Sequence, residues 1–198
     1  MLDNARMRAT AARVVDPLAR GLLRLGLTPN HVTFLTSGIL SVIVLYFWSR
    51  GEFALGFIVG TPFVFGDLLD GTMARLSGKT SAWGGFLDSV MDRVTDMAIL
   101  GSLVLWFASQ ENFVAQGFAL WAMASSVLIS YVRAKAEAVN LNGKVGLMER
   151  TERLIVVALC ALVAAFGYPQ SMVVCVVLLA TLNTFTLWQR LNAVAKSA

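Results

Sequence analysis

The sequence predicts an all-α integral membrane protein, with six transmembrane helices after an amphipathic helix on the membrane surface. Hydrophobic residues make up 57% of the 198-residue chain and charged residues only 14%, whereas soluble domains carry about 25% charged residues. The mean hydropathy is +0.70. Apolar runs of roughly 20 residues, long enough to cross the hydrocarbon core, recur between short polar loops. Together these observations argue against a soluble fold.

Residues 1–27 differ from the rest of the chain. Arg6, Arg13 and Arg20 recur at heptad spacing, and apolar residues supply the opposite side. A helix with this pattern lies in the interface between lipid and water. We therefore expect a juxtamembrane amphipathic helix that stops at Gly26. It either only anchors the chain or also covers a site beneath the transmembrane helices.

Six apolar runs follow this segment. Their approximate bounds are residues 31–48, 53–74, 84–107, 113–139, 148–166 and 170–188. The fifth run has the shortest apolar part. Because the loops are short and no internal repeat or long linker is visible, we expect one membrane domain over residues 1–198, with the six-helix bundle over residues 28–198.

The basic residues predict the orientation of the chain. If both termini are cytoplasmic, Arg50 is the only one of the 16 Lys and Arg residues on the outer side. An excess of Lys and Arg on the cytoplasmic side is typical of membrane proteins. The net charge of +4 therefore indicates attraction to anionic lipids and phosphate groups, with no implication of nucleic-acid binding.

Four aspartates form two pairs in the second and third runs. Asp67 and Asp70 are three residues apart, and Asp88 and Asp92 are four apart, so each pair lies on one face of its helix. Antiparallel neighbouring helices bring the pairs together at the cytoplasmic face. Divalent ions with oxygen ligands would remove the repulsion between four carboxylates and bind phosphate oxygens. We expect two Mg²⁺ ions, with Mn²⁺ as a possible substitute.

A wider pattern surrounds these acids. It resembles at every fixed position the signature of the CDP-alcohol phosphotransferases, Asp67-x2-Asp70-Gly71-x2-Ala74-Arg75-x8-Gly84-x3-Asp88-x3-Asp92. The resemblance implies a membrane enzyme in which an alcohol hydroxyl attacks a CDP-linked lipid and CMP leaves. It also implies that Asp67, Asp70 and Asp88 are metal ligands. Asp92 would be the general base and a ligand of the second metal, since an aspartate beside dications can accept the proton of an alcohol.

Small residues within the signature have two interpretations. They either allow close packing of transmembrane helices or let a flat group approach the backbone. In the complete signature we favour a floor for the cytidine and ribose, formed by Gly71, Ala74 and Gly84, with Arg75 near the pyrophosphate. Further positions resemble nucleotide contacts of the family, and these are Pro29, Asn30, His31, Val32 and Ser81. For His31, a polar helix-end residue at the interface is an equally good explanation.

Basic residues at the cytoplasmic ends of the last three runs offer a site for the acceptor. They are Arg133, Lys135, Arg153 and Arg190. They either set the topology or bind an acceptor that already carries a phosphate. The segments 19–29, 129–138 and 146–154 resemble the actinobacterial phosphatidylinositol phosphate synthases of the family, which favours phosphate binding.

That subfamily transfers a phosphatidyl group from CDP-diacylglycerol to inositol phosphate and releases CMP. The resemblance implies this reaction in the bacterial cytoplasmic membrane, by a homodimer with its active site on the cytoplasmic side. The alternative is a phosphatidylglycerophosphate synthase, because glycerol 3-phosphate is also an anionic acceptor. An ion-coupled transporter is a distant alternative. Transporters place acids near the bilayer midplane and show repeated halves, whereas the acids of this sequence cluster at one face and no second half repeats them.

Asp96 continues the helix face of Asp88 and Asp92 but lies outside the signature. A carboxylate in this setting needs a partner. We therefore expect it to bond to Arg93, to Thr95 or to a neighbouring helix, and we do not expect a fifth metal ligand.

Overall fold

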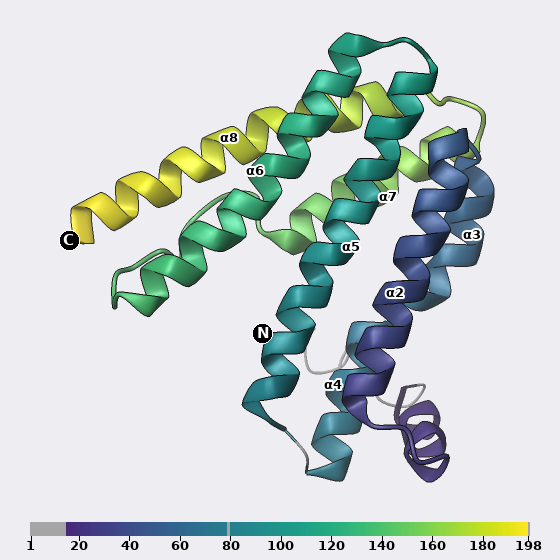
Figure 1. Ribbon diagram of the computed structural model, residues 1–198, viewed down its shortest axis with the longest axis vertical. Helices are drawn as coiled ribbons and strands as arrows, with labels where there is room; N and C mark the ends of the chain where they lie inside the picture. The colour runs from purple at the N-terminus through teal and green to yellow at the C-terminus, as the bar shows by residue number, and fades with distance from the viewer. Residues whose placement is uncertain (1–14, 79, 198) are drawn as a thin grey trace, which may run out of the picture. The chain divides into compact units, whose positions relative to one another are not determined.

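The computed structural model describes residues 15–78 and 80–197 (Figure 1). All regular structure within these ranges is helical, which confirms the predicted all-α class. A first helix covers residues 15–24. The elements after it are α2 (Pro29–Phe47), the 3-10 helix η1 (Trp48–Arg50), α3 (Phe53–Val64), α4 (Gly66–Ser77), α5 (Ala82–Ser109), α6 (Phe113–Ala138), α7 (Arg150–Ala165) and α8 (Ser171–Ser197).

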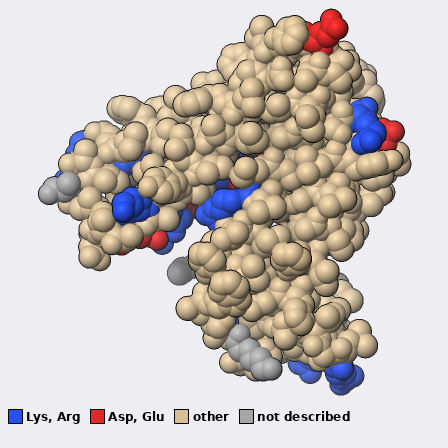
Figure 2. Space-filling view, in the orientation of Figure 1, with Lys and Arg blue, Asp and Glu red and all other residues tan. Residues whose placement is uncertain are grey.

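Within the described residues, four helical stretches are long and apolar enough to cross a membrane. They are Pro29–Arg50, Phe53–Ser77, Phe113–Ala138 and Ser171–Ser197. Helix α5 carries acidic residues in its first half, and α7 has only 16 residues. The prediction of several spans is thus supported, whereas the count of six is not reached by length and composition. Figure 2 shows a face made mostly of uncharged residues, with Lys, Arg, Asp and Glu in small groups.

The chain forms two compact units. The first contains Met1–Val42 and Gly60–Thr95, and the second contains Ile43–Val59 and Asp96–Ala198. The first unit therefore holds both aspartate pairs, and the second holds the basic residues predicted to bind the acceptor. The arginines predicted at positions 6 and 13 lie outside the described residues.

The N-terminal helix packs on α2 and α4 in the first unit. Ala19, Val32 and Met73 are buried together there, with partly buried leucines around them. The helix ends where Gly26 adopts φ +81° and the Leu27 N–H donates to the Leu22 carbonyl over 3.1 Å, a common way to satisfy the last carbonyls of a helix. The chain then enters α2 at a proline, which suits a first helical position.

The second predicted run is interrupted at Phe65, between α3 and α4. Pro62, inside α3, cannot donate a backbone hydrogen bond. Gly66 begins α4 so close to α2 that an added Cβ atom would clash with the side chain of Thr36. The missing side chain allows the two helices to approach, and this approach holds the first aspartate pair beside α2.

In the second unit, α6 and α7 both pack against α8 (Figure 1). Polar side chains join the buried faces of α6 and α8, where the Asn183 amide donates to the hydroxyls of Ser125 and Ser126 over 3.2 and 2.9 Å. Asn183 is fully buried. Hydrogen bonds of this kind join transmembrane helices where small residues allow close approach.

Side chains of α8 also hold the segment between α6 and α7, residues 139–149. The Met148 N–H donates to Thr186 Oγ1 and the Leu147 N–H to Gln189 Oε1, each over 3.0 Å. Arg190 Nε donates to the carbonyl of Val145 over 2.7 Å. This non-helical segment therefore takes much of its backbone hydrogen bonding from one helix, and it leads directly into Arg150 at the start of α7.

Candidate metal and nucleotide site

Three of the predicted metal ligands converge in the first unit. Asp67 and Asp70 project from α4 and Asp88 from α5, and one carboxylate oxygen of each lies within 4.8 Å of the others. A group of carboxylate oxygens suits hard divalent cations such as Mg²⁺, so the residues present fit the predicted metal. Asp92 lies one turn further along α5, outside this group, and its carboxylate is 3.7 Å from Arg93 Nη1.

Asp70 is the buried member of the group and has a partner that the sequence analysis missed. Its side chain is 8% exposed, and its Oδ2 accepts a hydrogen bond from Thr33 Oγ1 over 2.5 Å. Thr33 lies one helical turn after Pro29 on α2, so it shares a face with a predicted nucleotide contact. That periodicity was the only signal in the sequence that pointed to Thr33.

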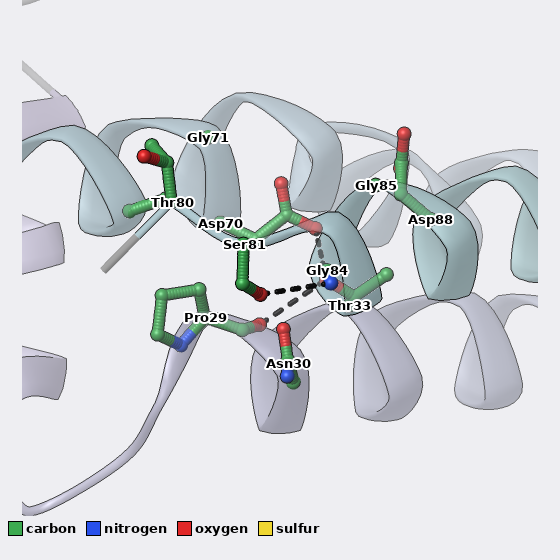
Figure 3. Close-up of a pocket in the computed structure, with 11 residues that line it drawn as sticks. Pro29, Asn30, Thr33, Asp70, Gly71, Thr80, Ser81, Gly84, Gly85 and Asp88 are labelled. Atoms are coloured by element: carbon green, nitrogen blue, oxygen red, sulfur yellow. Dashed lines mark hydrogen bonds between the residues drawn. The ribbon is translucent and has the colours of Figure 1, made fainter.

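A pocket of about 290 Å³ opens beside these carboxylates (Figure 3). Six of the predicted nucleotide contacts line it, namely Pro29, Asn30, Gly71, Ala74, Ser81 and Gly84. The structure adds five further lining residues, which are Thr33, Asp70, Thr80, Gly85 and Asp88. Two candidate metal ligands, Asp70 and Asp88, and the small residues of the signature thus line one pocket.

The two signature glycines face the pocket in different ways. A Cβ atom at Gly71 would meet only Arg75 Nη1, at 3.6 Å, whereas one at Gly84 would lie 3.2 Å from Asn30 Oδ1 and 3.3 Å from Ser81 Oγ. Ser81 also accepts the Gly84 N–H over 3.0 Å (Figure 3), as a residue before a helix often does. Gly84 therefore allows the side chains of Asn30 and Ser81 to approach closely, and Gly71 leaves open space.

Three predicted nucleotide contacts do not line the pocket. Val32 is 4% exposed and belongs to the buried cluster under the N-terminal helix. His31 is exposed, and its Nδ1 accepts the Thr28 N–H over 3.5 Å. Arg75 donates to Thr72 Oγ1 over 2.8 Å. Successive side chains of a helix point about 100° apart. The side chains of His31 and Val32 therefore point away from the face of α2 that carries Pro29 and Thr33.

Asp96 has partners on a neighbouring helix, one of the arrangements expected from the sequence. Its carboxylate lies 3.1 Å from Arg153 Nη2 and 3.5 Å from Arg150 Nε, both on α7. Arg153 is 5% exposed and also donates to the Met148 carbonyl over 3.4 Å. A guanidinium fixed by two acceptors keeps its remaining N–H groups in a defined direction.

The other predicted acceptor residues also belong to the second unit. Arg190 is 2% exposed and donates to the carbonyls of Val145 and Ile129. It lies within electrostatic range of Arg133 and Arg153. Arg133 pairs with Glu137 over 3.0 Å, and Lys135 is exposed on the same helix. The structure thus gathers three of the four predicted cations, and two of them, Arg153 and Arg190, are buried and bonded to other segments of the chain.

Residues 26–188 match the family described as CDP-alcohol phosphatidyltransferase. The chain belongs to this family. The match covers both aspartate pairs, the pocket and three of the four basic residues predicted to bind the acceptor, and Arg190 lies two residues beyond it.

Phosphatidylinositol phosphate synthases of two bacteria resemble the chain over most of its length. The phosphatidylinositol phosphate synthase of Streptomyces avermitilis is 45% identical over 172 residues, which are 84% of this chain and 70% of that protein. The enzyme of the same name from Mycobacterium marinum is 40% identical over 194 residues, or 94% of this chain and 82% of that protein.

Solved structures of a third synthase share the fold. The crystal structure of Mycobacterium tuberculosis phosphatidylinositol phosphate synthase with CDP-DAG bound matches with a TM-score of 0.88 and 38% identity, covering 94% of this chain and 96% of that one. The same enzyme in complex with manganese and citrate matches with a TM-score of 0.87 and 38% identity, covering 91% and 88%.

Proposed function

We propose that this protein transfers a phosphatidyl group from CDP-diacylglycerol to inositol phosphate, giving phosphatidylinositol phosphate and CMP. The observation that carries the proposal is the group of three carboxylates beside a pocket floored by small residues. Relatives at 40 and 45% identity are phosphatidylinositol phosphate synthases. A structurally similar synthase has been solved with CDP-DAG and with manganese, which supports a divalent metal and a CDP-lipid here.

In this mechanism Asp67, Asp70 and Asp88 would hold the metal ions, and Asp92 would be a further ligand of the second ion. Two bound Mg²⁺ ions, or Mn²⁺ in their place, would neutralise the diphosphate of the substrate and the charge that develops on the leaving CMP. Asp92 accepts the proton of the acceptor hydroxyl as the hydroxyl oxygen attacks phosphorus. The small residues around Gly71 let the nucleotide approach the helix backbone, with Arg75, whose guanidinium lies beside Gly71, as an outer contact.

The acceptor phosphate is bound by the basic residues of the second unit. Arg133, Lys135, Arg153 and Arg190 supply guanidinium and ammonium donors, and charge-assisted bonds to phosphate are stronger than neutral ones. The carbonyl and carboxylate partners of Arg153 and Arg190 hold these side chains in place before the acceptor arrives. The phosphate of a phosphorylated acceptor forms charge-assisted bonds with these basic residues, whereas free inositol has no phosphate to form them.

The proposed setting is the bacterial cytoplasmic membrane. One membrane domain crosses the bilayer six times, with α5 and α7 as the spans that carry charge or fall short in length. The distribution of basic residues supports cytoplasmic termini and a cytoplasmic active site. A homodimer is the assembly implied by the family resemblance.

An acceptor panel tests this function. Purified protein in lipid nanodiscs receives CDP-diacylglycerol and Mg²⁺ with inositol phosphate, free inositol, glycerol 3-phosphate or serine, and CMP release and the lipid product are measured. We expect product with inositol phosphate, and loss of CMP release on adding EDTA that excess Mg²⁺ reverses. Preferential use of glycerol 3-phosphate would assign the protein to phosphatidylglycerophosphate synthesis instead. CMP release that EDTA leaves unchanged would contradict the metal site.

A further inference from the structure

The hydroxyl group of Thr33 meets the buried metal-ligand candidate from a different helix. Thr33 lies on α2 and Asp70 on α4, and the two residues are 5% and 8% exposed. The hydroxyl oxygen is 2.5 Å from Asp70 Oδ2 (Figure 3). Asp67 is exposed and Asp88 is half-buried, so the ligand candidate that water reaches least is the one with this neutral donor.

A second acceptor competes for the same proton. Thr33 Oγ1 is also 3.1 Å from the carbonyl of Pro29, one turn earlier in α2. Threonine hydroxyls in helices commonly donate to the carbonyl four residues before, and this bond alone would make Thr33 an ordinary helix residue. A hydroxyl has one proton to donate. An ionised carboxylate is the stronger acceptor of the two, so the proton belongs on the bond to Asp70.

We propose that Thr33 is a positioning residue for the metal site, which fixes the carboxylate of Asp70 by donating to Oδ2 and so leaves Oδ1 to the ion. The inference rests on the metal-binding role of Asp70 in the proposed function. Hydrogen-bond donors behind a ligating carboxylate set its orientation, and their loss weakens metal affinity or activity. No contact between Thr33 and the substrate is required.

The packing of α2 on α4 makes this contact reliable. Gly66 brings the start of α4 against Thr36, one turn along α2 from Thr33, and Val32 packs with Met73 on the other side of Asp70. The hydroxyl therefore meets the carboxylate at a distance set by two helices packed at both ends of the contact. A donor on a flexible loop would not hold the carboxylate in one orientation.

The test measures binding of Mn²⁺, followed by electron paramagnetic resonance of the purified protein in detergent, without substrate. Thr33→Val keeps the shape of the side chain and removes the donor, and we expect it to weaken Mn²⁺ affinity by about 10- to 100-fold. Thr33→Ser keeps the hydroxyl and should restore most of the affinity. Thr36→Val is the matched control, because its hydroxyl bonds only to the backbone carbonyls of Val32 and Thr33, and it should bind Mn²⁺ like the wild type.

A double-mutant comparison shows whether Thr33 acts through Asp70. In an Asp70→Asn background, adding Thr33→Val should change the residual Mn²⁺ affinity less than twofold. Wild-type affinity in a Thr33→Val protein that has the wild-type melting temperature would overturn the inference and leave the proposed function intact. Equal losses in Thr33→Val and Thr36→Val would also overturn it. A wild-type protein that binds no Mn²⁺ would remove both the inference and the metal part of the proposed function.

Discussion

Asp96 and Arg153 form a buried ion pair between α5 and α7, with Arg153 Nη2 3.1 Å from Asp96 Oδ2. Their side chains are only 11% and 6% exposed. A charge so far from water is stable only with its partner, and removing one member leaves the other uncompensated. Asp96, which continues the signature face of α5, is therefore the counter-charge of Arg153, an arginine proposed to bind the acceptor.

The first prediction concerns this pair. Asp96→Asn should lower the free energy of unfolding by about 3 to 5 kcal/mol, because it leaves the Arg153 guanidinium buried without a counter-charge. Unfolding in detergent, followed by circular dichroism, measures the change. Glu137→Gln is the control. It breaks the pair between Arg133 and Glu137, whose side chains are 36% and 57% exposed, respectively, and it should cost less than about 1 kcal/mol. Equal losses in the two variants would contradict a special role for the buried pair.

Asp92→Asn tests the proposed general base. Asp92 lies outside the group formed by Asp67, Asp70 and Asp88, so its loss should remove the proton acceptor and spare that group. We expect the single-turnover rate to fall by about 10² to 10⁴, with CDP-diacylglycerol binding close to that of the wild type. Rapid-quench measurement of CMP release gives the rate, and calorimetric titration gives the affinity. Near-normal turnover would exclude this assignment.

The pocket floor is tested by a bulky side chain at Gly71. Gly71→Leu should abolish detectable CDP-diacylglycerol binding, because the residue lines the pocket and faces open space there. The melting temperature should change little. Gly117→Leu on α6 introduces the same side chain at a position with nothing within 4 Å and should leave binding intact. Unchanged affinity in Gly71→Leu would show that the nucleotide lies elsewhere.

Lys135 is the acceptor residue least involved in the fold. It is exposed, whereas Arg153 and Arg190 are buried and bonded to the chain itself. Lys135→Ala should raise the KM for inositol phosphate by roughly 10- to 100-fold, the loss of one charged hydrogen bond, and leave that for CDP-diacylglycerol unchanged. Steady-state kinetics with each substrate varied in turn measures both. Lys196→Ala removes an exposed charge at the end of α8 and should alter neither KM. An equal rise of the KM for inositol phosphate in Lys196→Ala would show that Lys135 acts only by non-specific attraction of the anionic acceptor.

The aspartate group was predictable because helical periodicity fixes which residues share a face, and the spacing of Asp67, Asp70 and Asp88 leaves little freedom. The small residues of the pocket followed from the same signature. Thr33 was not predictable as a partner of Asp70, because they are 37 residues apart and the contact depends on how α2 packs on α4. The break between α3 and α4 at Phe65 was not predicted either, because the apolar run continues through it.

The partners of the arginines also depend on distant segments. Arg153 meets Asp96 across 57 residues and Arg190 meets Ile129 across 61. Charge counting indicated cations for the acceptor but did not show that two of them also hold the fold together. The number of spans does not follow from composition alone, because the fifth run forms an α7 of only 16 residues and α5 combines a transmembrane length with the charges of the signature.

The bonds from α8 to residues 139–149 have a consequence for biosynthesis. The segment finds its partners at Thr186, Gln189 and Arg190, which are 38 to 45 residues later in the chain. Translation must therefore reach Arg190 before these backbone groups are satisfied. The aspartates of α4 and α5 are made much earlier, and their neighbours on α2 are made before them. The contacts around the aspartate group can thus form during translation, whereas the segment 139–149 gains these hydrogen bonds only after α8 has been made.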